Sequence, residues 1–347
     1  MPQQLEPPSF AVIPGGQVQQ VLDGTEKRIV ELVEACYRLH GEGQTANPPS
    51  YFLRFPDRPS DRIIALPASV GGEFNVDGLK WISSFPGNVA AGFPRASAVL
   101  ILNDPATGYP FACLESSIIS ATRTAASAAL AADWLTRNRT RPTRVGFVGG
   151  GLIARYVHRY LAATGWDFEE LGVQDLSPEH SRQFADYLRR SDSGRVVEYA
   201  TTDELIRACD LVVFATVSGE PYVSDVSAFA HNPVVLHVSL RDLAPEIILA
   251  STNILDDVEH CLKANTSPHL AEQATGNRDF VDGTLYDVMT GAVELRTDRP
   301  LVFSPFGLGV LDLALGRHIY DRVREAGQLS VVDDFFHELS RYGRTAP

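Results

Sequence analysis

The sequence predicts an α/β protein of two domains, in which a parallel sheet with crossover helices follows a mostly antiparallel sheet. Two observations predict this fold class. Short apolar runs over residues 62–114 are separated by turn signals, whereas from residue 144 apolar runs mostly alternate with segments long enough for crossover helices. The length of 347 residues also fits about two domains of ordinary size.

The first half begins with an amphipathic helix over residues 24–41, where apolar side chains recur at helical spacing. Turn signals such as Gly71-Gly72 and Asp77-Gly78 then separate short apolar runs, which predicts a meander of mostly antiparallel strands. An alanine-rich segment without Gly or Pro, residues 115–136, predicts a long helix leading out of this sheet. The expected strands cover residues 62–68, 74–83, 96–102 and 109–114.

The second half has the alternating pattern of a doubly wound parallel sheet. Its expected strands cover residues 145–148, 171–173, 196–199, 211–215, 234–238, 254–255 and 301–303. Helical patterns over residues 308–325 and 332–342 follow the last strand. The end of the chain is therefore free to return to the first domain.

Composition excludes several classes of function. The 30 Lys and Arg residues against 43 Asp and Glu residues give a net charge of −13, which would repel a nucleic acid backbone. No apolar run is long enough to span a membrane, and the first residues lack the pattern of a signal peptide. Four widely spaced cysteines read as free thiols, and the nine histidines show no metal-ligand spacing. We expect a cytoplasmic protein that binds neither a metal, a membrane nor nucleic acid.

The strongest local motif lies between an expected strand and an expected helix. Gly149, Gly151 and Ala154 fit the pattern G-x-G-x-x-G/A. Such glycines let the backbone approach a pyrophosphate at the positive end of the following helix. The motif predicts a Rossmann dinucleotide-binding domain, although a tight glycine turn of structural purpose gives the same letters.

A carboxylate supports the nucleotide interpretation. Asp175 ends the next expected strand, where it would accept hydrogen bonds from the adenosine ribose and repel a 2′-phosphate. NAD is therefore the predicted cofactor, in preference to NADP. The alternative role of Asp175 as a strand-end turn former stays open, and Arg182 nearby argues the other way.

Cationic residues stand in unusually apolar segments of the first half. Lys80 lies within an expected strand, Arg62 and Arg95 begin expected strands, and Arg123 interrupts the alanine-rich helix. Each alone is more often a surface residue or part of a structural salt bridge. Together, in an acidic chain, they predict a pocket for substrate carboxylates, with which Arg pairs bidentately.

Asp242 follows an expected strand at the carboxyl edge of the parallel sheet, where ligands of such folds bind. By itself this residue reads as a strand-end cap. No G-x-S-x-G or Walker A motif occurs, so the sequence does not support hydrolysis or phosphoryl transfer.

These motifs, taken in order, resemble the ornithine cyclodeaminase/mu-crystallin superfamily over nearly the whole chain. The similar segments are Gly78-Leu-Lys-Trp81, Leu102-Asn-Asp-Pro105, Leu114-Glu-Ser-Ser117, Ser120-Ala-Thr-Arg123, Gly149-Gly-Gly-Leu-Ile153, Leu240-Arg-Asp242 and Phe306-Gly-Leu-Gly309. Segments near Arg62, Lys80, Arg95 and Asn103 are most similar to the N-(2-amino-2-carboxyethyl)-L-glutamate dehydrogenases of siderophore and peptide antibiotic pathways. Phe306 and Leu308 depart from this pattern, because such relatives often have methionines there.

The resemblance implies a Rossmann domain, residues 139–312, and a split α+β domain, residues 1–138 and 313–347, that binds substrate and forms a homodimer. It places Lys80 and Asp242 in catalysis and Arg62, Arg95 and Arg123 on an amino-acid-derived substrate. The residues expected to contact NAD are Gly149, Gly151, Leu152, Ile153, Asp175, Thr216, Ser239 and Gly307.

The implied reaction oxidises a carbon–nitrogen bond with NAD and releases L-2,3-diaminopropionate and 2-oxoglutarate. Lys80 would take the amine proton or polarise a carboxylate, and Asp242 would activate water. Three alternatives stay open: an ornithine cyclodeaminase, an alanine dehydrogenase type of enzyme, and a non-enzymatic, crystallin-like protein that binds nucleotide and a small ligand.

Overall fold

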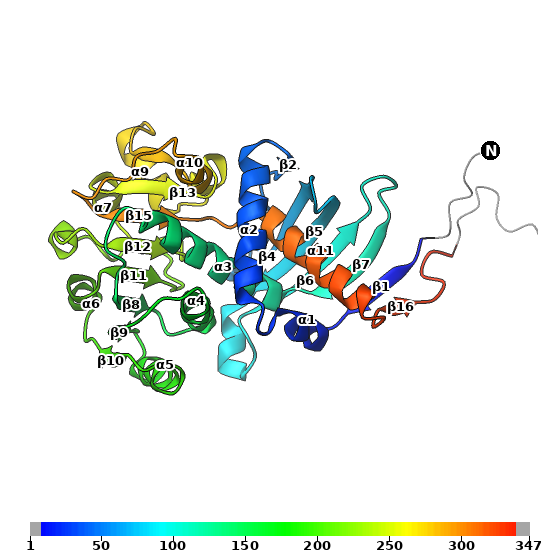
Figure 1. Cartoon of the computed structure of the whole chain (residues 1–347), viewed down its shortest axis with the longest axis horizontal. Helices are drawn as coiled ribbons and strands as arrows, with labels where there is room; N and C mark the ends of the chain where they lie inside the picture. Colours follow the sequence, from blue (N-terminus) through cyan, green and yellow to red (C-terminus); the bar gives the residue numbers. More distant parts are fainter. Residues whose placement is uncertain (1–7, 338–347) are drawn as a thin grey trace, which may run out of the picture. The chain divides into compact units, whose positions relative to one another are not determined.

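The computed structural model describes residues 8–337, which form two compact units (Figure 1). The first unit contains residues 8–25, Glu42–Ser120 and 309–337, and the second contains Glu26–Gly41 and Ala121–Leu308. The chain passes from the first unit to the second twice, once after Thr25 and once within helix α3 (Ser117–Leu135). The predicted domain limits at residues 138 and 313 stay a prediction, but most of α3 groups with the second unit.

The first unit is built around one mixed sheet. Its elements are β1 (Phe10–Ile13), α1 (Gly15–Leu22), β2 (Thr45–Ala46), β3 (Tyr51–Phe55), β4 (Arg58–Val70), β5 (Val76–Ser84), the 3-10 helix η1 (Pro86–Ala91), β6 (Ala96–Asn103), β7 (Pro110–Glu115), α11 (Gly309–Glu325) and β16 (Ser330–Val332). The strand order is β16-β1-β7-β6-β5-β4-β2, with β3 also paired to β4. Strands β4 to β7 form the predicted antiparallel meander.

Helix α11 packs on one face of this sheet, against β4, β5 and β6 (Figure 1). Glycines make the close approach possible: a Cβ on Gly78 would lie 2.7 Å from a methyl carbon of Leu313, and one on Gly316 would collide with Leu100. The strand face beneath α11 carries the side chains of Leu66 and Lys80, which are paired across β4 and β5. Two of the cations predicted from the sequence, Lys80 and Arg62, lie on this face.

One predicted helix, over residues 332–342, is wrong in the part that the structure describes. Residues Ser330–Val332 form strand β16, antiparallel to β1, and residues 333–337 form turns and bends. Two β-branched residues, Val331 and Val332, suit a strand, and the edge of β1 offers them backbone partners that helical periodicity does not reveal. Residues 338–342 lie outside the described residues.

The second unit confirms the predicted doubly wound sheet. Its elements are α2 (Glu26–Gly41), α3, β8 (Arg144–Val148), α4 (Leu152–Ala163), β9 (Glu170–Gln174), α5 (Pro178–Ser191), β10 (Arg195–Glu198), α6 (Thr202–Ala208), β11 (Leu211–Phe214), η2 (Val226–Phe229), β12 (Val234–His237), α7 (Pro245–Leu249), β13 (Thr252–Leu255), α8 (Val258–Cys261), α9 (Ser267–Thr275), β14 (Val281–Thr284), α10 (Leu285–Thr290) and β15 (Leu301–Ser304).

All strands of this sheet are parallel, in the order β10-β9-β8-β11-β12-β15-β13-β14, with helices on both sides (Figure 1). The first five follow the Rossmann order 3-2-1-4-5, which reverses between β8 and β11. Strands β8, β9, β11 and β12 are buried almost throughout, as expected where helices cover both faces. Ligands of such folds bind beyond the carboxyl ends of the strands at this reversal.

Candidate functional site

A cavity of about 550 Å³ lies at the carboxyl ends of β8, β9 and β11, where the strand order reverses. It is lined by Val148, Gly149, Gly151, Gln174, Asp175, Leu176, His180, Ala215, Thr216, Val217, Ser218 and Tyr222. Four of the residues predicted to contact the nucleotide therefore line it: Gly149, Gly151, Asp175 and Thr216. Leu152, Ile153, Ser239 and Gly307 are not among the lining residues that the structure describes.

The predicted glycines shape this cavity through their lack of side chains. Gly149 has φ +91°, and a Cβ there would lie 2.8 Å from the carbonyl oxygen of Ala215. Gly151 precedes the first turn of α4, and nothing lies within 4 Å of where its Cβ would be. The backbone at the positive end of α4 is therefore open to an anion such as a pyrophosphate.

Asp175 combines the two roles that the sequence left open. Its Oδ2 accepts a hydrogen bond from the backbone N–H of Gly150 at 2.8 Å, and its Oδ1 accepts one from Ser177 N–H at 2.8 Å. The carboxylate thus fixes the glycine turn, and it also lines the cavity. Its remaining lone pairs can receive ribose hydroxyls, since a carboxylate offers about four acceptor positions.

Asp242 lies beyond β12 and is fully buried, at the centre of a hydrogen-bond network. Its Oδ1 accepts a hydrogen bond from the Thr216 hydroxyl. Its Oδ2 contacts Ser239 Oγ at 2.5 Å and His237 Nε2 at 3.1 Å. The Tyr222 side chain lies close enough to this carboxylate for the Asp242 charge to raise the pKa of Tyr222. Asp242 is therefore more than the cap of a strand end.

The network sets the protonation of its members. Burial raises the pKa of Asp242, but hydrogen bonds from His237, Ser239 and Thr216 and the charge of His237 outweigh it and lower the pKa to about 2. Burial and the nearby Asp242 charge raise the pKa of Tyr222, so its hydroxyl keeps its proton. The backbone N–H of Tyr222 also donates to the Asp242 carbonyl at 3.0 Å, which fixes the two residues together.

Thr216 and Tyr222 connect Asp242 to the cavity, because both line it while Asp242 itself is enclosed. The sequence analysis missed Tyr222 because it lies 20 residues before Asp242, in a loop with no motif of its own.

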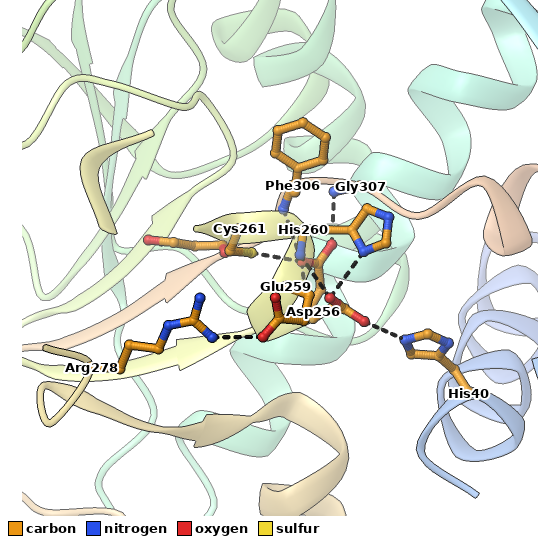
Figure 2. Close-up of polar contacts among 10 residues, drawn as sticks. His40, Asp256, Glu259, His260, Cys261, Arg278, Phe306 and Gly307 are labelled. Carbon is orange, nitrogen blue, oxygen red and sulfur yellow. Dashed lines mark hydrogen bonds and ion pairs between the residues drawn. The ribbon is translucent and has the colours of Figure 1, made fainter. Parts of the chain in front are cut away.

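A second buried carboxylate, Asp256, holds the segment that carries Gly307 (Figure 2). Its Oδ1 accepts from the backbone N–H of Phe306 at 2.9 Å, and its Oδ2 accepts from Gly307 N–H at 2.7 Å. The Cys261 thiol lies 3.0 Å from the same carboxylate. Burial and the charge of Asp256 raise the pKa of this thiol, which therefore stays protonated.

The neighbouring Asp257 joins the end of β13 to α2. Its Oδ2 lies 3.0 Å from His40 Nε2, and its Oδ1 lies 3.0 Å from His260 Nδ1. Although burial raises the pKa of Asp257, the hydrogen bonds from His260 and His40 bring it far below its usual range. Asp257 is thus a negative charge that fastens a helix to the sheet.

Arg123 projects from α3 toward Gly307. Gly307 has φ +93°, and a Cβ at this position would collide with the guanidinium of Arg123. Because Gly307 has no side chain, there is room for the guanidinium of Arg123 beside it. Arg123 belongs to the same compact unit as the nucleotide cavity.

The other predicted cations lie in the first unit. Lys80 is buried, with its Nζ 2.6 Å from Asp312 Oδ2 on α11 and 3.3 Å from Ser120 Oγ. Arg95 donates to Ser84 Oγ at 2.7 Å. The ion-pair partner of Lys80 escaped the sequence analysis, because 232 residues separate it from Asp312.

Neither a membrane-spanning helix nor a metal-binding cluster occurs in the described part of the chain, residues 8–337. No helix there is long and apolar enough to cross a membrane. No group of three or more His, Cys, Asp or Glu side chains within those residues is arranged to hold a metal ion.

Comparison with known proteins gives relatives over most of the chain. The nodulation efficiency protein NfeD of Rhizobium meliloti is 29% identical over 309 residues, which are 87% of this chain and 92% of that protein. The N-((2S)-2-amino-2-carboxyethyl)-L-glutamate dehydrogenase of Staphylococcus aureus is 28% identical over 274 residues, 77% of this chain and 80% of that protein.

The solved structure of an archaeal alanine dehydrogenase dimer with bound NAD shares the fold, with a TM-score of 0.82 at 24% identity over 94% of this chain and 100% of that chain. The profile of one protein family matches residues 18–327, which include every predicted site residue. The resemblance inferred from the motifs is confirmed by this match: the chain belongs to the ornithine cyclodeaminase/mu-crystallin family.

Proposed function

We propose that this chain oxidises N-(2-amino-2-carboxyethyl)-L-glutamate with NAD and cleaves the product into L-2,3-diaminopropionate and 2-oxoglutarate. The observation that carries the proposal is the buried carboxylate of Asp242, which is hydrogen-bonded to the Thr216 hydroxyl in the lining of the nucleotide cavity. A protein that only bound a nucleotide would not need a buried anion linked to the cavity by a hydroxyl group. We further propose that the product serves siderophore or peptide natural product synthesis.

The coarser activity agrees with that of the curated relatives. The chain is an oxidoreductase that acts on a CH–NH bond with NAD, as the dehydrogenases and reductases among its relatives are. The finer assignment of the substrate rests on the motif similarity and on the 28% identity to the Staphylococcus aureus enzyme.

NAD fits the cavity on the evidence of its lining. Gly149 and Gly151 leave room for a pyrophosphate, and Asp175 is placed for the ribose hydroxyls. When bound there, NAD supplies a hydride acceptor. Gly307 follows β15, a strand of the same sheet, and its backbone is held by Asp256. The guanidinium of Arg123, on α3, lies beside Gly307.

The chain's own residues would then divide the reaction between them. Arg62, Arg95 and Arg123 hold substrate carboxylates and so orient the glutamyl Cα–H bond that is oxidised. Lys80 polarises the adjacent carboxylate as an ammonium group, or takes the proton of the secondary amine after passing its own proton to Asp312. Loss of hydride from Cα and of a proton from nitrogen leaves an imine on the substrate.

Asp242 acts in the step that follows. Water adds to the imine carbon, and its proton passes to the Tyr222 oxygen while the Tyr222 hydroxyl gives its own proton to Asp242. The low pKa of Asp242 suits a transient acceptor better than a resting base. In the collapse of the carbinolamine, the proton held by Asp242 passes to the nitrogen and the hydroxyl group loses its own proton. The carbon–nitrogen bond then breaks, which leaves the ketone of 2-oxoglutarate and the amine of 2,3-diaminopropionate.

The test is a product balance with the purified enzyme. We expect one NADH and one 2-oxoglutarate for each molecule of 2,3-diaminopropionate. NADH formation from alanine without cleavage would instead support the alanine dehydrogenase type of activity, and cyclisation without net NADH would support a cyclodeaminase.

The cofactor assignment gives a separate prediction for Asp175. The Asp175→Asn variant loses the charge that repels a 2′-phosphate, and weaker hydrogen bonds to the ribose remain. We expect the preference for NADH over NADPH to fall by about 10- to 100-fold. Titration of both nucleotides against wild type and variant measures this, and tighter binding of NADPH by the wild type would contradict the assignment.

We also propose that the chain forms a homodimer through the sheet of its first unit. The face opposite α11 exposes apolar side chains, including Trp81 at 40%, Val99 at 39% and Leu53 at 46%. Trp81 and Val99 are direct partners across β5 and β6, so the apolar surface is continuous. Exposed apolar patches of this kind mark protein interfaces, and the archaeal relative is described as a dimer.

The Trp81→Asp variant tests this interface, because a charge at its centre opposes association. We expect light scattering at micromolar concentration to find a dimer for the wild type and a monomer for the variant. Leu249→Asp, at an exposed apolar position of the second unit, is the matched control and keeps the dimer. A monomeric wild type would refute the interface.

A further inference from the structure

Three arginines form a continuous strip on one face of the first unit's sheet. Arg54 on β3 is the direct cross-strand partner of Arg62 on β4, and Arg62 is in turn the partner of Ser84 on β5. The Ser84 hydroxyl accepts a hydrogen bond from Arg95 Nη1 at 2.7 Å. The side chains of Arg54, Arg62 and Arg95 are thus brought together by strand register and one serine.

This arrangement places like charges side by side. Directly opposed residues in an antiparallel pair have Cβ atoms about 5 Å apart, and like charges there are destabilising. Burial and the charge of Arg54 lower the pKa of Arg62, and burial and the charge of Arg62 lower the pKa of Arg95. Arg62 is therefore repelled by the positive charge of Arg54, and Arg95 by that of Arg62.

No carboxylate of the described chain, residues 8–337, forms an ion pair with any of these three arginines. Their neighbour Arg58 differs, because it lies 3.8 Å from a carboxylate oxygen of Asp57 and 3.9 Å from one of Asp61. A chain with 43 acidic side chains and a net charge of −13 thus leaves one cationic strip without such a partner. This is the charge pattern of a site for an external anion.

The strip shares a sheet face with Lys80. Side chains alternate along a strand, so Arg62 and Leu66, four residues apart on β4, point to the same face. Leu66 is the cross-strand partner of Lys80 on β5. A ligand on this face of the sheet can therefore meet both Lys80 and the strip.

We infer that Arg54, Arg62 and Arg95 form a subsite for an additional carboxylate, so that the substrate carries at least two carboxylates. This inference rests on the proposed function and deepens it by naming the group that selects the substrate. Guanidinium groups bind carboxylates bidentately, and a bound carboxylate relieves the repulsion among the three cations. Arg54, which the sequence analysis did not identify, is a specificity-determining residue of this subsite.

The experiment compares two substrates that differ only at one carboxylate. One is N-(2-amino-2-carboxyethyl)-L-glutamate, and the other is the analogue whose glutamyl side-chain carboxylate is a primary amide. We expect wild-type kcat/KM to be about 10²-fold lower for the amide. Arg54→Gln should lower kcat/KM about 10- to 100-fold for the acid and less than about threefold for the amide.

Arg58→Gln is the matched control, since Arg58 lies nearby but has its own carboxylate partners. It should leave kcat/KM for both substrates within about twofold of wild type. Equal use of the acid and the amide by the wild type, or an equal loss for both in Arg54→Gln, would overturn the subsite while leaving the proposed dehydrogenase intact.

If neither substrate reduces NAD, the proposed function fails and the subsite is judged by thermal unfolding at low salt. Removal of one repelling charge should raise the Tm of Arg54→Gln above that of the wild type. Citrate, used as a polycarboxylate probe, should raise the Tm of the wild type and of Arg58→Gln but not that of Arg54→Gln. Equal citrate shifts in all three proteins would reject the subsite.

Discussion

Asp242→Asn is expected to reduce NAD in a first turnover and then stall. The amide keeps the shape of the side chain, but it cannot accept hydrogen bonds from all of Thr216, Ser239 and His237, and it cannot take a proton from water. In a single-turnover experiment, NADH absorbance should still rise as a burst, provided that the reverse hydride transfer does not remove it. Release of 2-oxoglutarate should slow by roughly 10²-fold or more.

Two companion variants make this result specific. Tyr222→Phe keeps the ring and removes the hydroxyl, so it should show the same burst and stall if protons pass through Tyr222. Asp225→Asn makes the same substitution at a partly exposed aspartate, which caps η2, and it should behave as the wild type. Simultaneous loss of the burst and of 2-oxoglutarate in Asp242→Asn would place Asp242 at or before hydride transfer.

Lys80→Met should abolish the burst itself and also weaken the fold. The substitution removes the ammonium group that pairs with the buried carboxylate of Asp312. Breaking one side of a buried ion pair costs about 3–5 kcal/mol of the free energy of unfolding. Chemical denaturation measures this loss, and stopped-flow absorbance at the NADH band measures the burst.

The double variant Lys80→Met, Asp312→Asn separates the two effects. Without the buried anion, most of the lost stability should return, whereas NAD reduction should remain absent because the amine is not prepared. A double variant that regains NADH formation along with its stability would show that Lys80 serves the fold alone. Wild-type NAD reduction by Lys80→Met would contradict our division of the roles of Lys80 and Asp242.

The fold was predictable where local signals coincide with the final contacts. Turn dipeptides join the hairpins of the first unit. The parallel sheet of the second unit is indicated by apolar runs that are separated by segments long enough for crossover helices. The helix predicted over residues 332–342, which is wrong for the described residues 332–337, shows the limit of this reasoning. Val332 becomes part of a strand because β1, more than 300 residues earlier, provides an edge that no local pattern contains.

The candidate site divides in the same way. Gly149, Gly151 and Asp175 belong to one compact motif, so sequence alone places them beside a nucleotide. No motif marks Tyr222, Asp256 or Asp312. The role of each residue depends on contacts with a partner that is distant in the sequence. Arg54 was overlooked because an exposed arginine looks ordinary until its strand register sets it opposite Arg62.

The carboxylate of Asp256 also has a consequence for how this enzyme can change during evolution. It fixes the amides of Phe306 and Gly307 from the neighbouring strand β13, so a segment outside the sheet has its backbone held as firmly as a strand. Because the backbone of this segment is fixed, substitutions in it change the side chains without moving the main chain. New substrate preferences in descendants should therefore arise first at positions such as Phe306, with Asp256 and Gly307 left unchanged.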